Sequence, residues 1–284
     1  MSRIVYVNGE YLNEADAKIS VFDRGFLFAD AVYEVSSVLA GKLIDNKGHL
    51  QRLSRSLNEL NISAPASNDE ITAIQKSLIE KNHLDQGLVY LQVTRGAADR
   101  DFTYPKGAKP SLVMFTQEKN LLQSPAAEKG ISVITTPDIR WQRRDIKTVA
   151  LLAACMAKME AKKAGADDAW FEEDGFITEG SSSNAYIVTK DGKIVTRHLG
   201  TQILAGITRQ AIMKLAEQQQ LVIEERPFSV DEALHAAEAF ITSATTFVTP
   251  VIAINGEKIG EGQPGPIARI LRKFYIQMAL EAIE

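Results

Sequence analysis

Trp141-Gln142-Arg143-Arg144-Asp145-Ile146-Lys147-Thr148 is the stretch of this chain that decides the fold. It joins residues 131–135, whose apolar pattern favours a strand, to residues 148–164, whose Ala-, Leu- and Met-rich pattern favours a helix. Lys147 therefore lies where a buried strand is followed by a buried helix, away from bulk water. Desolvation, together with the two arginines of the stretch, favours a neutral, nucleophilic amine. We expect a Schiff-base lysine, although most lysines are simply solvated surface charges.

The composition is that of an ordinary globular protein. The chain has 284 residues, of which 45% are hydrophobic and 24% charged, and this length favours two domains. A net charge of −4 offers no basic surface to nucleic acid or to an anionic membrane. No apolar run approaches the roughly 20 residues of a membrane span, and the first residues lack a signal-peptide core. The single cysteine, Cys155, predicts a cytoplasmic protein, and we expect it as a small core residue of the helix at residues 148–164. The scattered histidines predict no metal site.

Two parts of unequal size are expected along the chain. We predict a smaller N-terminal α/β domain at residues 1–118, a linker at residues 119–129 and a larger C-terminal domain at residues 130–284, so the fold class is α+β. Asn8-Gly9 and Gly41-Lys42 mark two hairpins in the first domain, and Asp174-Gly175, Asp191-Gly192 and Asn255-Gly256 are typical of tight turns in the second. Beyond residues 148–164, the periodicity predicts helices at residues 49–60, 69–81, 208–219, 230–236 and 267–282.

Three further motifs place polar groups at strand ends or at the start of a helix. Glu179 precedes a Gly-Ser-rich turn and a strand, which favours delivery of its carboxylate to a backbone-lined pocket. Gly206-Ile207-Thr208 opens a helix and offers N–H groups and the helix dipole to a phosphate. Ser243 ends a strand in a hydroxyl-rich turn. Each motif alone has a plain alternative, such as an incidental surface glutamate or a capping threonine. Together with the lysine they describe a pyridoxal phosphate site.

Nearly the whole chain resembles the class IV aminotransferases, the fold-type IV pyridoxal phosphate enzymes. It is most similar to the D-amino acid aminotransferases of this family. The resemblance implies a two-domain fold with a β-barrel-like core in the C-terminal domain, and pyridoxal 5'-phosphate as the cofactor. The motifs that carry it are Phe22-Asp23-Arg24-Gly25-Phe26, Tyr33-Glu34-Val35, His49-Leu50-Gln51-Arg52-Leu53, Gln92-Val93-Thr94-Arg95-Gly96, Asp145-Ile146-Lys147, Thr178-Glu179-Gly180-Ser181-Ser182-Ser183-Asn184 and Gly206-Ile207-Thr208-Arg209.

The resemblance implies a role for each residue around the cofactor. Lys147 matches the lysine that forms the internal aldimine and later moves the substrate Cα proton. Glu179 matches the acid that keeps the pyridine nitrogen protonated, so that the ring accepts electron density. Arg52 matches the phosphate-binding arginine, whose fork suits phosphate. Ala244 stands where the family often has threonine, so it serves only through its N–H. The other implied cofactor contacts are Ile207, Thr208, Ser243, Leu204 and Ser182.

The substrate side departs from the family pattern. Tyr33 and Arg100 match residues that bind the substrate α-carboxylate, with Val35 beside them and Arg100 contributed by the second subunit of a homodimer. Arginine suits this role because it holds a carboxylate bidentately. The family pattern Arg-x-His reads Arg100-Asp101-Phe102 here, so the histidine is missing and a negative charge is added. A solvated Arg100 paired with a neighbouring aspartate is the alternative.

The activity implied by the resemblance is a ping-pong transamination from a D-amino acid, such as D-alanine, to a 2-oxo acid, such as 2-oxoglutarate, in a homodimer with shared active sites. Three alternatives use the same scaffold: a branched-chain L-amino acid aminotransferase, an (R)-selective amine transaminase, which the missing histidine favours, and an aminodeoxychorismate lyase. A cofactor-binding or regulatory protein without turnover is a further alternative. The presence of Lys147 and Glu179 argues against it.

Overall fold

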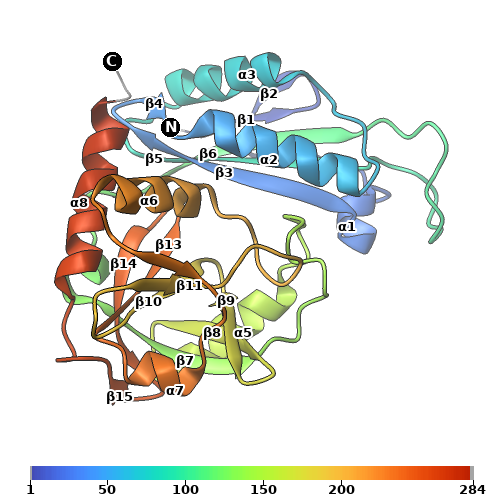
Figure 1. Ribbon diagram of the computed structural model, residues 1–284. Coiled ribbons are helices and arrows are strands. Elements are labelled where there is room, and N and C mark those ends of the chain that lie inside the picture. Colours follow the sequence, from blue (N-terminus) through green and yellow to red (C-terminus); the bar gives the residue numbers. More distant parts are fainter. Residues whose placement is uncertain (1, 282–284) are drawn as a thin grey trace. The chain divides into compact units, whose positions relative to one another are not determined.

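The computed structural model describes residues 2–281, which form two compact units, each built on its own β-sheet (Figure 1). The first unit contains residues 2–120 and Ile146–Ala150, and the second contains Leu121–Asp145 and Leu151–Glu281. The short segment with Lys147 therefore belongs to the first unit, although the residues on both sides of it in sequence belong to the second. The mixture of helices with largely antiparallel sheets confirms the predicted α+β class.

The first unit is built on a six-stranded antiparallel sheet with the order β2-β1-β6-β5-β3-β4. Both predicted hairpins are present. Asn8-Gly9 forms the first turn as expected, and the second turn is Ala40-Gly41, one residue before the expected Gly41-Lys42, as the positive φ angles of these residues show. The strands are β1 (Ile4–Val7), β2 (Glu10–Asn13), β3 (Ala31–Leu39), β4 (Lys42–Leu43), β5 (Gly87–Thr94) and β6 (Ser111–Glu118).

Helices α2 (Asn46–Glu59) and α3 (Asn68–Lys81) cover one face of this sheet (Figure 1). A short helix, α1 (Arg24–Phe28), precedes β3. Ser67 caps α3 and forms a capping box with Glu70, so the helix begins at Asn68, one residue before its expected start. The core between helices and sheet includes Val32, Leu91, Val93 and Met114 from the strands and Leu50, Leu53, Leu57, Ile71 and Leu78 from the helices.

The second unit is built on a nine-stranded mixed sheet with the order β12-β11-β10-β13-β14-β7-β8-β9, and β15 pairs with β14. The turns predicted at Asp174-Gly175 and Asn255-Gly256 are confirmed by positive φ angles at all four residues. The strands are β7 (Ile131–Pro137), β8 (Asp168–Glu173), β9 (Phe176–Gly180), β10 (Asn184–Val188), β11 (Ile194–Thr196), β12 (Ile223–Glu225), β13 (Glu238–Ser243), β14 (Phe247–Ile254) and β15 (Glu257–Lys258).

Five helices pack on or beside this sheet in the described part of the second unit: α4 (Pro125–Lys129), α5 (Leu152–Lys163), α6 (Ile207–Gln218), α7 (Val230–Leu234) and α8 (Pro266–Glu281). A residue of the sheet holds the start of α8. The Glu238 carboxylate of β13 accepts hydrogen bonds from the N–H groups of Ile267 (3.0 Å) and Ala268 (3.1 Å). Across residues 2–281, none of the helices combines the length and the apolar character that a membrane span needs.

The helix expected from residue 148 begins four residues later, at Leu152. Residues 147–149 are extended beside β3 instead, with a bridge between Val32 and Thr148. The expected burial of this helix is also wrong, since Leu152 is 75% exposed and Cys155 is exposed rather than part of the core. The alanine side of α5 faces β8 instead, where Ala157 and Ala161 pack against Ala169 and Phe171.

The cap of α8 gives a testable prediction. Glu238→Ala leaves one buried and one partly buried N–H group at the start of the helix without their acceptor, so we expect the free energy of unfolding to fall by about 1–2 kcal/mol. Urea denaturation measures this loss, with Glu261→Ala as the control because Glu261 is exposed. Equal losses in the two variants would contradict the capping role.

Candidate active site

Lys147 is held beside the start of β3. Its carbonyl accepts a hydrogen bond from the Tyr33 N–H (3.0 Å), and its own N–H donates to the Ser56 hydroxyl of α2 (3.4 Å). Neighbouring residues of an extended chain point to opposite sides. Ile146 is buried in the core under the helices, so the Lys147 side chain points the other way, and its Nζ lies 4.0 Å from the centroid of the Tyr33 ring.

The Tyr33 ring, on which the Lys147 amine rests, is itself fixed by other aromatic rings. It stacks on Tyr90 of β5 with centroids 5.6 Å apart, and Tyr90 stacks on Phe115 of β6 at 4.7 Å. Val35, two residues along β3, is the Cα partner of Tyr90. The structure therefore brings Lys147, Tyr33 and Val35, all expected site residues, to the same side of β3.

Arg52 lies on the opposite side of β3 and is bound to Glu34. Its Nε and Nη2 each donate to a carboxylate oxygen of Glu34 at 2.7 Å, and Nδ1 of His49 lies 2.7 Å from the same carboxylate. Burial raises the pKa of Glu34, but the charge and hydrogen bonds of Arg52 and the contribution of His49 outweigh it and lower this pKa to about 2. No sequence motif predicts this shared partner, although the spacing of His49 and Arg52, three residues apart on one helix face, is compatible with one.

Glu179 is a buried acid of the second unit, at the end of β9. One carboxylate oxygen accepts from Arg140 Nη1 (2.7 Å), and the other accepts from Asn184 Nδ2 and from the Leu204 N–H (both 3.1 Å). Burial raises the pKa of Glu179, and the charge of Arg140 opposes this shift only in part. The carboxylate is thus shielded from water, in an environment where one more cationic donor would stabilise its charged form.

Arg140 connects Glu179 to a second buried carboxylate, Asp138. Its Nε and Nη2 donate to the two oxygens of Asp138 at 2.9 and 2.7 Å, and its guanidinium lies 4.3 Å from the centroid of the Phe171 ring. The Thr178 hydroxyl also donates to Asp138 (2.7 Å). No motif in the sequence singles out Arg140, because its partners come from β9 and from the end of β7.

The arginines expected to act on the lysine amine are paired with carboxylates. Arg143 Nε lies 3.0 Å from Asp145 Oδ1, and Arg144 Nη2 lies 2.9 Å from Glu173 Oε1. Glu173 is 29 residues away in sequence, so a local reading of the stretch gives no sign of this pair. Both cationic charges are balanced within the second unit.

The start of α6 is arranged around Asn184. Its Nδ2 also donates to the Leu204 carbonyl (2.9 Å), and a Cβ on Gly206 would lie 2.1 Å from its Oδ1, so only glycine fits at position 206. Gly206 is the N-cap of α6 and has no side-chain capping hydrogen bond. The N–H groups that open the helix at Ile207 and Thr208 therefore form the type of helix start that binds phosphate.

Ser243 ends β13 next to the start of β10, because Asn184 and Thr242 are paired in the sheet. Its hydroxyl lies 2.7 Å from the Thr246 hydroxyl. Phe247 then begins β14 with a φ of 56°, which is rare for a bulky side chain and indicates a constrained turn. Thr246 thus supplies a hydroxyl in the turn where Ala244 has none.

Ser182 and the preceding serine differ in their surroundings. Ser182 is exposed in the turn between β9 and β10, whereas Ser181 is buried and its hydroxyl donates to Asp168. Contact of Ser182 with a cofactor ring stays a prediction, as does that of Leu204, whose backbone is already bound to Glu179 and Asn184.

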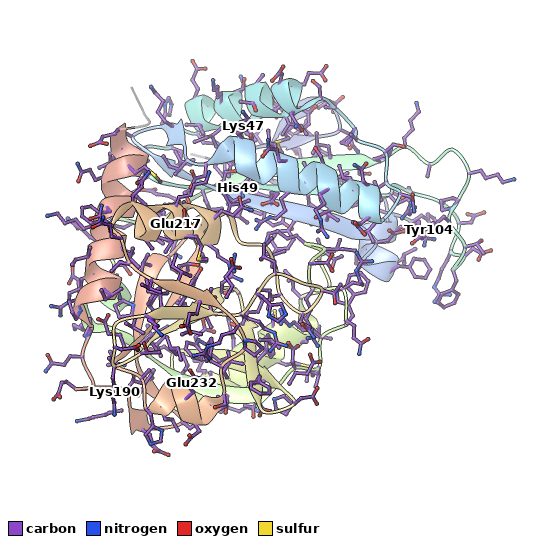
Figure 2. All side chains as sticks on the ribbon, viewed as in Figure 1. Lys47, His49, Tyr104, Lys190, Glu217 and Glu232 are labelled. Atoms are coloured by element: carbon purple, nitrogen blue, oxygen red, sulfur yellow. The ribbon has the colours of Figure 1, made fainter. Side chains whose placement is uncertain are left out.

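Arg100 lies in the exposed loop between β5 and β6, which also carries Tyr104 (Figure 2). Its guanidinium lies 5.3 Å from the Phe28 ring centroid and 5.4 Å from that of Phe102. The loop is tied to α1, since Arg24 Nη1 donates to the Asp101 carbonyl (2.6 Å). Phe102, which stands in place of the family histidine, is 78% exposed. Arg100 thus packs on aromatic rings of its own unit.

These residues fit the chemistry of pyridoxal phosphate. The first unit carries the amine of Lys147, while the second carries the buried acid Glu179, a helix start open to an anion, and the hydroxyls of the turn at Ser243. An aldehyde, a pyridine nitrogen and a phosphate each find a chemically suitable partner in this set. In residues 2–281 no group of three or more His, Cys, Asp or Glu side chains is arranged to hold a metal ion.

Comparison with known proteins shows similarity along almost the whole chain. Residues 31–254 match the family model described as amino-transferase class IV. A D-alanine aminotransferase of Staphylococcus aureus (strain MSSA476) is 38% identical over 272 residues, which cover 95% of this chain and 96% of that protein. A D-alanine aminotransferase of Bacillus licheniformis is 40% identical over 267 residues, or 93% of each chain.

Solved structures show the same fold. The branched-chain amino acid aminotransferase of Escherichia coli superposes with a TM-score of 0.91 at 23% identity, covering 98% of this chain and 95% of that one. The T.th. branched-chain amino acid aminotransferase complexed with N-(5'-phosphopyridoxyl)-L-glutamate gives a TM-score of 0.89 at 25% identity, covering 98% and 94%. These likenesses confirm the predicted fold-type IV architecture.

The buried carboxylate of Glu34 gives a pH prediction. Its pKa is about 2 in the folded chain against an ordinary value of 4.5, so its stabilising contribution is complete above pH 4.5 and is lost as the pH falls toward 2. We expect the free energy of unfolding to decline less steeply in this window for Glu34→Gln than for the unmodified chain. Denaturant titrations at a series of acidic pH values measure both slopes, and identical slopes would contradict the assignment.

Proposed function

Since the chain belongs to the family of class IV aminotransferases, we propose that it transfers the amino group of a D-amino acid, such as D-alanine, to a 2-oxo acid, such as 2-oxoglutarate. Pyridoxal 5'-phosphate is its cofactor. The observation that carries the choice of substrate is the identity of 38–40% with two D-alanine aminotransferases over nearly the whole chain. The reaction has a ping-pong order, in which the first oxo acid leaves before the second one binds.

Residues of both units have a role in the proposed reaction. When bound, pyridoxal phosphate supplies an aldehyde that captures amines and a ring that accepts electron density from Cα. Nζ of Lys147 would hold the cofactor aldehyde and, when free, would take the proton from the substrate Cα. Glu179 holds the ring nitrogen in its protonated form, and Arg140 and Asn184 fix the Glu179 carboxylate for this task.

The phosphate is bound by backbone and hydroxyl donors together with one cation. The N–H groups of Ile207 and Thr208 lie at the positive end of the α6 dipole. The proposed phosphate ligands are Arg52, Ile207, Thr208, Ser243 and the N–H of Ala244. Leu204 and Ser182 line the ring.

The substrate α-carboxylate is bound by Tyr33 and Arg100, and Val35 lines the space for the substrate side chain. Tyr33 lies directly under the Lys147 amine, which supports its place next to the reacting atoms. Because Phe102 replaces the histidine of the family pattern, Arg100 is the main cation for the carboxylate.

We also propose a homodimer with shared active sites, to which Arg100 is contributed by the partner subunit. Support comes from α1 and the Arg100 loop of the first unit, where Phe26, Phe102 and Tyr104 are exposed by 75%, 78% and 56%. Sedimentation velocity of the purified chain tests this, and an active monomer would contradict it.

We also propose a cytoplasmic location, which the single Cys155 favours.

Removal of the lysine amine tests the catalytic assignment. Lys147→Ala should abolish the visible absorbance of the lysine-bound cofactor and lower the transamination rate by more than about a thousandfold, because the nucleophile and the proton carrier are lost together. Lys163→Ala, an exposed lysine on α5, is the matched control and should behave as the unmodified enzyme. Full activity of the Lys147→Ala variant would refute the assignment.

A half-reaction screen decides among the substrate classes. The cofactor-loaded enzyme is mixed with D-alanine, L-leucine or (R)-1-phenylethylamine, and the loss of the visible absorbance is followed. We expect D-alanine to react fastest. A faster reaction with L-leucine would favour the second candidate, a branched-chain L-amino acid aminotransferase, whose solved structures share this fold.

The remaining alternatives give other results in the same screen. Preference for the amine that lacks a carboxylate would favour an (R)-selective amine transaminase. Release of pyruvate without an amino acceptor would favour an aminodeoxychorismate lyase. Bound cofactor that no amine converts would identify a protein without turnover.

A further inference from the structure

Glu34, His49 and Arg52 form a buried charged cluster between β3 and α2. The Glu34 side chain is 0% exposed, and it receives Nε and Nη2 of Arg52 and Nδ1 of His49, each at 2.7 Å. His49 lies between the ribbons of α2 and β3, whereas Lys47, two residues earlier, lies on the other side of the helix (Figure 2). His49 and Arg52 of α2 thus both bind Glu34 of β3.

Chain stability alone does not account for this cluster. The attraction within a buried ion pair often does not offset the free-energy cost of removing both charges from water. A protein with well-packed apolar residues at the same positions is often equally stable or more stable. Leu50, Leu53 and Leu57 of this helix already pack on the sheet, and its buried polar residues are His49, Arg52 and Ser56. A fully buried carboxylate among them indicates a need for a fixed charge.

The geometry of the pair fixes the direction of the Arg52 guanidinium. Glu34 binds it bidentately through Nε and Nη2, a contact that restricts rotation about the last bonds of the arginine side chain. His49 holds the carboxylate in turn. Arg52 is 9% exposed, so it lies at the margin of the core. Tyr33, which contacts the Lys147 amine, is the neighbour of Glu34 on β3, so one strand positions both the arginine and the lysine.

We propose that Glu34, itself held by His49, is a positioning residue that fixes the guanidinium of Arg52 for the cofactor phosphate. This inference rests on the proposed function, in which Arg52 binds that phosphate. Replacement of Glu34 has two opposite effects on phosphate binding, and the net result distinguishes a positioning role of Glu34 from a role in charge balance alone. Loss of the Glu34 charge strengthens the attraction of the cluster for a phosphate, whereas loss of the anchor weakens a directed contact.

The test compares two ligands that differ only in the phosphate. The affinity of the cofactor-free protein for pyridoxal 5'-phosphate and for pyridoxal is measured by titration of the visible absorbance. Glu34→Gln should weaken pyridoxal phosphate binding about tenfold or more and change pyridoxal binding less than about twofold. Arg52→Lys should give a similar loss, because lysine lacks the fork. The double variant should lose little more than either single one.

Asp30→Asn is the matched control. Asp30 is a largely buried carboxylate of the same unit, and it also binds two cations, Arg24 Nε (2.8 Å) and Arg95 Nε (2.7 Å). We expect its replacement to affect stability and to leave the ratio of the two affinities unchanged. A change in this ratio as large as that in Glu34→Gln would show a general effect of buried charge loss and would overturn the proposal.

Two substitutions of His49 keep the test decisive if Glu34→Gln does not fold. His49→Leu removes the donor to Glu34 and should weaken pyridoxal phosphate binding selectively, by about threefold. His49→Asn keeps an N–H near the position of Nδ1 and should restore the affinity. An unchanged ratio in His49→Leu would overturn the proposal.

Other outcomes for Glu34→Gln are equally clear. Binding of pyridoxal phosphate as tight as or tighter than in the unmodified chain would overturn the proposal, and so would equal losses for both ligands. Failure of the proposed function looks different, because the unmodified chain would then show no visible absorbance that Lys147→Ala removes.

Discussion

The hydrogen bond between the Tyr33 N–H and the Lys147 carbonyl is the constraint on which the arrangement of the first unit depends. It places residues 147–149 alongside β3, and the alternation of an extended chain then directs Ile146 into the core and the lysine amine onto the Tyr33 ring. The same alternation along β3 directs Glu34 toward α2. One short strand segment therefore determines where an amine and a guanidinium lie.

The second unit depends on the hydrogen-bond donors that surround one buried carboxylate. Glu179 loses its hydration on burial, and Arg140, Asn184 and the Leu204 N–H replace water as donors. Asn184 uses the same amide to hold the turn before α6. The Glu179 carboxylate and the start of α6 are thus held by a single side chain, which lies so close to Gly206 that a Cβ there would clash with it.

Local signals in the sequence predict local features well. Asn8-Gly9 and Asn255-Gly256 lead to the expected turns because the backbone angles of such turns suit few other residues. The helix α6 agrees with its apolar periodicity to within one residue at each end, whereas α2 begins three residues before its expected start. Motif similarity also identifies Lys147 and Glu179 as candidates, and the structure places the Lys147 amine on the Tyr33 ring and buries Glu179.

Features that depend on residues distant in sequence cannot be predicted from local sequence signals. Helical composition continues from residue 148, yet residues 147–149 are extended because β3 offers them hydrogen bonds. Periodicity also cannot tell which side of α5 meets a sheet, so the exposure of Leu152 and Cys155 differs from expectation. The partners of Arg140 and Arg52 come from strands that only the folded chain brings to them.

The course of the chain at Ile146–Ala150 has a consequence for how this protein can be divided or recombined. These five residues belong to the first unit, but they are encoded inside the second. A fragment that ends at residue 120 contains the six-stranded sheet without the segment that borders β3. The exchange of one unit between homologous genes at a single crossover therefore separates the lysine from the tyrosine that contacts it, so a functional chimera of this chain requires three joints rather than one.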